Sequence, residues 1–314
     1  MRTLIAGPND SGQRLDKFIT KAVPLLPQGL LYKYIRLKRI KVGGKRTEIA
    51  YRLLEGDRVD LYINDEFFAP REDALPFLRA RDGLEVVYED QNLLLADKPA
   101  GLVVHEDESG EADTLINRVL RYLYQKGEYD PADENSFAPA LCNRIDRNTS
   151  GIVICAKNAP TLRVMNQKIK DREIDKYYRC LVFGRPSPDH AVLKAYMVKD
   201  AAENRVRVSD RPLADGRTMI TEYTVLDSNG RYSLLEVRLH TGRTHQIRAH
   251  LAYIGHPLLG DTKYGTNRQN QGLPYRYQAL CSWRLVFSFT TPAGHLEYLR
   301  GKAVELPRLP FSLP

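Results

Sequence analysis

Short apolar runs bounded by turn residues dominate the chain from Leu84 onward, and this pattern restricts the fold most. Two predicted strands, at 219–227 and 232–239, flank Asn229-Gly230, a dipeptide typical of hairpin turns. Other predicted strands occupy 84–89, 92–98 and 151–157, and a last hairpin is expected over 285–299. Helical spacing appears at 112–124, 159–169 and 244–254. Strands that alternate with a few helices and include hairpins predict an α+β fold with a mainly antiparallel sheet.

A different pattern precedes this region. Apolar residues at Leu15, Phe18 and Ile19 continue through 22–23 with the spacing of an amphipathic helix, and a second, basic helix is expected within 30–40. A short strand then leads into the Gly43-Gly44 turn, and alternating apolar residues at 59–63 predict a closing strand. These features and the Pro- and Gly-containing stretch that follows predict three parts: a small domain at 1–65, a linker at 66–83 and a larger domain at 84–314.

Charge is distributed unevenly along the chain. There are 47 Lys and Arg residues against 39 Asp and Glu, which gives a net charge of +8. Residues 1–65 carry +6 and residues 131–314 carry +10, whereas residues 66–130 carry −8. A basic surplus in blocks favours a polyanionic partner, either nucleic acid or an anionic membrane.

The strongest basic run lies between Leu30 and Arg46, where seven basic residues occur without an acid. A solvated basic face on a small domain is the ordinary explanation. However, a face of cations alone repels itself, and RNA phosphates would offset that repulsion. The candidate RNA-binding residues of this run are Lys33, Arg36, Lys38, Arg39, Lys41, Lys45 and Arg46.

Several protein classes are disfavoured. The four cysteines form no C-x-x-C pair, so we expect reduced, packed thiols and neither a disulfide scaffold nor a zinc ribbon. No apolar run is long enough to cross a bilayer, and the apolar stretch near Met1 is too short for a secretory signal. The composition is typical of a soluble cytoplasmic protein of 314 residues.

Three polar stretches carry the candidate chemistry. In the first, Asp146 lies between Arg144 and Arg147 in a turn before a buried strand. A carboxylate beside guanidinium groups stays ionised, which suits a nucleophile or a general base, although a turn-capping role is at least as good an explanation. In the second, Tyr177 and Tyr178 point to opposite faces of a strand, so one of them could face a cleft or both could simply pack.

The third stretch is the turn 241–244, which enters a predicted helix. Arg243 in this turn could clamp a carboxylate or a phosphate. The histidines around it do not have the spacing of a metal motif, and we expect capping or packing roles for them. They are His240, His245, His250 and His256.

The N-terminal segment resembles the RNA-binding module named after ribosomal small-subunit protein four. The matching residues are RLDKFI (14–19), YIRLKRIKVGGKR (34–46) and EGDRV (55–59). In that family the second helix and the turn after it grip structured RNA. The resemblance therefore implies the same role for the basic run.

The rest of the chain resembles the RluA type of RNA pseudouridine synthase. The motifs that carry the resemblance are DKPAGLVVH (97–105), NRIDRNTSGIVICAK (143–157), KYYRCLVFG (176–184) and LHTGRTHQIRAHLAYIGHPLLGDTKYG (239–265). Asn143 stands where the family usually has His, which could alter the local loop. The resemblance implies isomerisation of uridine to pseudouridine in structured RNA, with large-subunit ribosomal RNA preferred and transfer RNA possible.

Roles for individual residues follow from that resemblance. It implies that Asp146 is the catalytic carboxylate, that Arg243 pairs with it, and that Tyr178 stacks on the target uracil. Arg144 would fill the gap left by the flipped base, and Arg147 would contact RNA. No cofactor or metal is implied, and a monomer is expected. Two other functions stay open: a non-catalytic RNA-binding or ribosome-assembly protein with this fold, and, less favoured, a hydrolase of free nucleosides.

Overall fold

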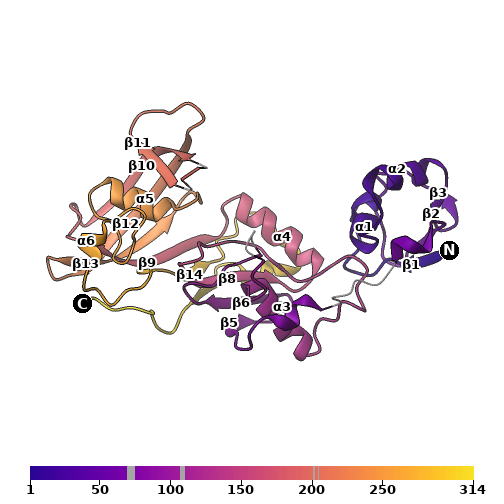
Figure 1. Cartoon of the computed structure of the whole chain (residues 1–314), viewed down its shortest axis with the longest axis horizontal. Coiled ribbons are helices and arrows are strands. Elements are labelled where there is room, and N and C mark those ends of the chain that lie inside the picture. Colours follow the sequence, from indigo (N-terminus) through magenta and orange to yellow (C-terminus); the bar gives the residue numbers. More distant parts are fainter. Residues whose placement is uncertain (69–74, 107–109, 201, 204) are drawn as a thin grey trace.

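The fold is built on two β-sheets that share no strand. The computed structural model describes residues 1–68, 75–106, 110–200, 202–203 and 205–314. One sheet has four strands in the order β1-β4-β2-β3, and the other has eleven strands. The small sheet lies at one end of the long axis of the molecule, and strands β10 and β11 lie toward the other end (Figure 1).

The N-terminal elements agree with the prediction of two helices, a hairpin and a closing strand. They are β1 (Arg2–Ile5), α1 (Leu15–Ala22), α2 (Gln28–Arg36), β2 (Ile40–Val42), β3 (Lys45–Arg46) and β4 (Arg58–Leu61). Strand β1 was not predicted; it pairs antiparallel with β4 and completes the sheet. The buried residues of α2, Leu31, Tyr34 and Ile35, pack into the core that the N-terminal elements share. The basic residues of α2 therefore remain on its outer side.

A polar contact joins the N-terminal elements to the rest of the chain. The buried Asp10 carboxylate accepts hydrogen bonds from the Ser136 hydroxyl at 2.5 Å and from the Asn135 amide at 2.9 Å. Asn9 donates to Glu134 at 2.6 Å. Two short 3₁₀ helices occur here: η1 (Asp65–Phe68), which begins at the last residue of the predicted small domain, and η2 (Pro76–Arg79), within the predicted linker. Residues 69–74 of the linker lie outside the described residues.

The large sheet has the path β11-β10-β12-β13-β9-β14-β8-β6-β5, with β15 and β7 attached to β14 and β8. Its strands are β5 (Glu85–Glu89), β6 (Leu93–Lys98), β7 (Ala140–Leu141), β8 (Ser150–Ala156), β9 (Asp175–Phe183), β10 (His190–Asp200), β11 (Arg205–Ser209), β12 (Arg217–Ser228), β13 (Tyr232–Leu239), β14 (Leu280–Val286) and β15 (Ala303–Glu305). In the described part of this sheet, only β14 and β8 pair in parallel. The α+β class with a mainly antiparallel sheet is therefore confirmed.

The helices of this region match their predicted positions to within a few residues. They are α3 (Leu115–Gln125), α4 (Ala159–Lys170) and α5 (Gln246–Tyr253), with a further short helix α6 (Asn267–Asn270). The hairpin expected over 285–299 is wrong. β14 ends at Val286 and its partner β15 begins only at Ala303, because the 3₁₀ helix η3 (Gly294–Leu299) packs its apolar residues Leu296 and Leu299 into the core between them.

The side chains of strand β9 point alternately to the two faces of the large sheet. Tyr178 and Cys180 share a core with Ile247 of α5, whereas Leu181 packs with Ala279 toward the C-terminal tail. Tyr177 also points away from Tyr178, and the Arg284 guanidinium lies 4.1 Å from its ring centroid. In the described part of the chain, no helix is long and apolar enough to cross a membrane.

Candidate active site

The candidate site is a cleft of about 1000 Å³ on the α5 side of the sheet. Its lining includes Asp146, Tyr178 and Arg243, which lie on three separate segments of the chain. The tertiary structure thus brings together the three residues that the resemblance singled out as catalytic. Arg144 and Arg147 line the same cleft.

The turn that carries Asp146 is fixed by its surroundings. The Asn143 side-chain carbonyl accepts the Ile154 backbone N–H at 2.8 Å, and the Thr149 N–H donates to the Asp146 carbonyl at 3.0 Å. Gly151, with φ of +109°, is the second residue of β8 and lies directly against β14, where an added Cβ would lie 2.2 Å from the Ser282 carbonyl oxygen. Only glycine allows this approach, so the turn enters the sheet at one defined point. Through this contact Asn143 ties the loop that carries Asp146 to β8.

Lys98 also supports the turn that carries Asp146, by a hydrogen bond to the Arg147 carbonyl. Its ammonium group is fully buried and donates to the carbonyls of Leu102 at 2.7 Å, Arg147 at 2.8 Å and Pro99 at 2.9 Å. Burial lowers the pKa of Lys98 to about 7, against the opposing effect of the nearby Asp146 charge. Three acceptors match the three protons of an ammonium group. The residue therefore ties the segment 99–102 to the loop that bears Asp146.

The arginine paired with Asp146 is Arg248, which is a correction to the expected partner Arg243. Arg248 Nη1 lies 3.1 Å from Asp146 Oδ2, whereas Arg243 Nε points to the Thr218 carbonyl at 3.5 Å. The turn before α5 directs Arg243 to the rim of the cleft. Arg248 is the third residue of α5, within its buried stretch Gln246 to Leu251, and its side chain reaches the carboxylate.

A second carboxylate holds Arg248 in place. Asp261 accepts from Arg248 Nε at 2.7 Å and from Nη2 at 3.0 Å, a paired contact in a buried setting. The Arg248 guanidinium lowers the pKa of the Asp261 carboxyl against the effect of its burial. Such forked pairs fix the plane of a guanidinium. Asp261 therefore determines the direction in which the remaining nitrogen of Arg248 points.

Sequence reasoning did not single out Lys98, Arg248 or Asp261, although all three lie in the quoted motifs. Arg248 follows Arg243 by five residues within one motif, and no local signal in the predicted helix 244–254 distinguishes the two arginines.

Tyr178 closes one wall of the cleft. Its side chain is 6% exposed and shares an apolar cluster with Ile247 and Leu280. Burial raises the pKa of the Tyr178 phenol, and the Asp146 charge adds to this effect. The hydroxyl therefore keeps its proton at neutral pH, and the wall presents one polar group on an apolar surface.

The two arginines that flank Asp146 differ. Arg147 pairs with Glu111 at 2.9 Å and donates through Nε to the Gly101 carbonyl at 3.1 Å. Arg144 is exposed and has no ion pair with any described carboxylate. The pKa of His105 is lowered mainly by burial and in addition by the positive charge of Arg144. Arg144 is therefore the freer of the two cations at the mouth of the cleft.

The four histidines each bond a neighbouring group: Glu222 for His240, Tyr264 for His245, Thr221 for His250 and the Phe183 carbonyl for His256. In the described residues, no cluster of His, Cys, Asp and Glu could hold a metal ion. The polar partners of these four histidines belong to strands of the sheet and to the loop after α5.

The seven cations of the N-terminal run are all on the surface, with Lys41 half-buried. None of them forms an ion pair with a carboxylate in the described ranges of the chain. Arg39 lies 5.4 Å from the ring centroid of Tyr34, and Lys41 lies 5.2 Å from that of Tyr62. These charges are available to an external anion.

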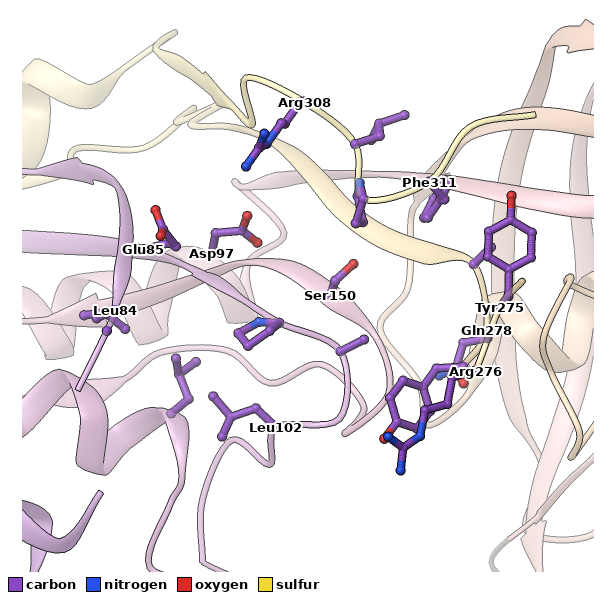
Figure 2. A pocket seen from close by; sticks show the side chains of 18 of the residues that line it. Leu84, Glu85, Asp97, Leu102, Ser150, Tyr275, Arg276, Gln278, Arg308 and Phe311 are labelled. Carbon is purple, nitrogen blue, oxygen red and sulfur yellow. The ribbon is translucent and has the colours of Figure 1, made fainter. Parts of the chain in front are cut away.

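A second pocket, of about 740 Å³, lies under the C-terminal tail (Figure 2). Figure 2 shows Glu85 and Asp97 at one side and Arg276 at another, with Arg308 and Phe311 on the tail above. Its lining contains neither Asp146 nor Tyr178. Its charges are of both signs, and burial and the nearby Glu85 charge raise the pKa of Asp97. The arrangement of Asp146, Arg248 and Tyr178 described above belongs to the other cleft.

Known proteins provide an independent comparison. The family model described as RNA pseudouridylate synthase matches residues 92–253. An RNA pseudouridine synthase of Mycoplasma genitalium is 33% identical over 286 residues, which cover 89% of this chain and 87% of the relative. Ribosomal large subunit pseudouridine synthase C of Vibrio cholerae is 30% identical, over 82% of this chain and 78% of its own length.

Solved structures give the same fold. Human RNA pseudouridylate synthase domain containing 4 superposes with a TM-score of 0.56 at 21% identity, covering 72% of this chain and 88% of the human one. The fold of the large-sheet region is therefore that of the pseudouridylate synthases.

Proposed function

Because the chain belongs to the RNA pseudouridine synthase family, we propose that it converts specific uridines to pseudouridine in structured RNA, with large-subunit ribosomal RNA as the preferred substrate. The observation that carries the proposal is the Asp146 carboxylate, held by Arg248 in a cleft that also contains Tyr178. A pure RNA-binding protein has no use for a carboxylate aimed at a polyanion. This geometry favours catalysis over the non-catalytic alternative.

The reaction is an isomerisation whose atoms balance without a cofactor. The bond between N1 of uracil and C1′ of ribose breaks, and a bond from C5 of the base to C1′ forms. C5 then loses its proton, and N1 gains one. In this proposal Asp146 attacks the nucleotide or assists the departure of the base, and Arg248 aims the carboxylate and balances its charge.

Tyr178 is proposed as the surface on which the uracil ring stacks. The apolar wall around it suits a planar base, and the phenol, which keeps its proton, can hydrogen-bond to the base as it turns. We also propose that the hydroxyl helps to move the proton from C5. Arg243, at the rim, is proposed as a phosphate contact in place of the carboxylate clamp.

The target base must leave its stack to reach this cleft. Flipping costs roughly a few kcal/mol, and phosphate contacts elsewhere would offset that cost. We propose that Arg144 occupies the gap left by the base, since it is exposed beside Asp146 and unpaired among the described carboxylates. Arg147 would exchange its surface pair with Glu111 for a phosphate.

We propose that the small domain at 1–65 binds the RNA and that the segment 66–83 links it to the catalytic domain at 84–314. Seven surface cations without a described carboxylate partner support it. Ribosomal RNA is favoured because the relative from Vibrio cholerae is named for the large ribosomal subunit, while transfer RNA is the second candidate. A monomer that acts in the cytoplasm would suffice for either substrate.

The deciding experiment incubates the protein with ribosomal RNA and with transfer RNA, both transcribed without modification, and maps pseudouridine. We expect pseudouridine at discrete positions of the large-subunit RNA, and none with Asp146→Asn. Pseudouridine in the transfer RNA alone would change the substrate. Binding without any pseudouridine would support the non-catalytic alternative, and release of uracil from free uridine would indicate a hydrolase.

A further inference from the structure

A tyrosine hydroxyl, a histidine ring and the candidate catalytic carboxylate lie in a row at the edge of the cleft. Tyr264 Oη is 2.9 Å from His245 Nδ1, and Nε2 on the other side of the same ring is 3.9 Å from Asp146 Oδ2. The rings of His245 and Tyr264 meet edge to face, with centroids 5.7 Å apart. The side chain of His245 is only 10% exposed, so its orientation is set by these neighbours.

The Tyr264 hydroxyl has a second partner, and this partner decides where the protons are. Val206 of β11 donates its backbone N–H to Tyr264 Oη at 2.9 Å. The oxygen therefore already acts as an acceptor, and its one proton needs an acceptor in turn. In the described surroundings that acceptor is His245 Nδ1. Burial lowers the pKa of His245, so the ring is neutral and carries its single proton on the other nitrogen, Nε2.

The opposite arrangement leaves a group unpaired. If Nδ1 carried the proton, Tyr264 Oη would accept from both Val206 and His245, and the hydroxyl hydrogen of this half-buried side chain would have no acceptor among the described atoms. A donor without a partner in the protein loses the hydrogen bond that the Nε2–H form makes. In the Nε2–H form the Tyr264 hydroxyl donates to Nδ1 and accepts from Val206, and the N–H of His245 points toward Asp146 Oδ2, 3.9 Å from Nε2.

The backbone of His245 is also unusual. Its φ of +51° and ψ of +20° are left-handed, which is uncommon for a residue with a side chain. It is the first residue before α5, yet its side chain makes no capping hydrogen bond to the helix. Such conformations cluster at functional sites when the surroundings hold them in place. Here the conformation places the ring between Tyr264 and Asp146.

We propose that Tyr264 is a positioning residue that holds His245 as its Nε2–H form, so that this N–H faces Asp146 as a second donor beside Arg248. The inference rests on the proposed function, because it takes Asp146 as the catalytic carboxylate. At 3.9 Å the N–H is poised just beyond hydrogen-bond range, and a small shift of the carboxylate during the reaction brings it into contact. The loop after α5 thereby controls both partners of Asp146, since Asp261 holds Arg248 and Tyr264 holds His245.

The first test needs no RNA. Nitrogen NMR of protein labelled at histidine distinguishes the two neutral forms, and the spectrum of His245→Gln identifies the signals of His245. We expect the Nε2–H form in the unmodified protein and a loss of that preference in Tyr264→Phe, which keeps the ring and removes only the hydroxyl. A Nδ1–H form in the unmodified protein, or an unchanged His245 signal in Tyr264→Phe, would overturn the proposal.

The second test measures single-turnover pseudouridine formation in ribosomal RNA. Tyr264→Phe and His245→Gln should each slow the reaction roughly tenfold, the effect of removing one hydrogen bond to a charged group, with unchanged RNA affinity. The double variant should be no slower than the slower single variant, because both changes remove one unit. Tyr277→Phe, at the second pocket, is the matched control and should keep the full rate.

The two proposals fail in different ways. Absence of pseudouridine with the unmodified protein would refute the proposed function and leave the NMR result standing, and full activity of Asp146→Asn would refute the catalytic role of Asp146 on which this inference rests. An inactive Asp146→Asn together with full rates for Tyr264→Phe and His245→Gln would refute this inference alone. Additive losses in the double variant would also refute it, since the two side chains would then act separately.

Discussion

Arg248 reaches Asp146 through one guanidinium nitrogen, Nη1, at 3.1 Å. Its other two nitrogens are held by the buried Asp261. The candidate catalytic carboxylate therefore faces an arginine whose orientation is set from behind.

Asp146→Asn should abolish pseudouridine formation, because a neutral amide cannot serve as the nucleophile or base. RNA affinity should stay the same or increase, since the change removes a negative charge that faces phosphates. Mapping of pseudouridine and a binding titration measure the two quantities. Turnover above a few per cent of the unmodified rate would contradict the role of Asp146.

Arg248→Lys should slow single-turnover pseudouridine formation by about 100-fold, because an ammonium group cannot hold Asp261 by a fork and reach Asp146 at the same time. The melting temperature should also fall, as the buried Asp261 loses part of its pairing. Rates are therefore compared at a temperature where circular dichroism shows the variant folded.

Arg243→Lys is the matched control for that variant. Its charge is kept, and the one hydrogen bond described for its side chain, to the Thr218 carbonyl at 3.5 Å, is long. We expect a rate within a few fold of the unmodified protein. A severe loss in Arg243→Lys with a mild one in Arg248→Lys would reverse the assignment of the two arginines.

Removal of residues 1–63 should leave a folded catalytic domain that binds RNA more weakly and with a flatter dependence on salt. Every phosphate that the shortened protein no longer neutralises should reduce the slope of log affinity against log salt by about 0.9 on duplex nucleic acid. The triple variant Lys33→Gln, Arg36→Gln, Arg39→Gln keeps the domain and removes three surface cations. An unchanged slope in both proteins would mean that this domain does not bind RNA.

Acid should destabilise the protein partly through His250. Its ring is 2% exposed, and burial lowers its pKa from 6.5 to about 4. Between these values the unfolded chain binds a proton that the folded chain does not, so stability is lost as pH falls from 6.5 toward 4, by up to about 3 kcal/mol. Urea unfolding of the unmodified protein and of His250→Asn at about pH 7 and about pH 4.5 measures the difference. The variant should lose less stability over this interval, and an equal loss would exclude His250 as the cause.

Local pattern predicted most of the elements. The amphipathic spacing of α1, the turn at Asn229-Gly230 and the apolar run of β8 each depend on neighbours in the sequence, and each was predicted correctly. The last hairpin was not, because η3 is stabilised by Leu296 and Leu299 packing against strands that lie far away in the chain. Strand β1 was missed for the same reason, since its pairing with β4 spans more than fifty residues.

The sequence by itself determined which kinds of chemistry are available. It placed Asp146 in a polar turn before a buried strand, placed Tyr178 on the opposite strand face to Tyr177, and collected seven cations in one run without an acid. Only the tertiary structure decided which groups meet. Arg243 and Arg248 are equally charged and five residues apart, and no local rule separates them. The choice depends on the direction of α5 and on Asp261, whose buried carboxylate comes from a different segment and leaves one arginine, with one free nitrogen, facing Asp146.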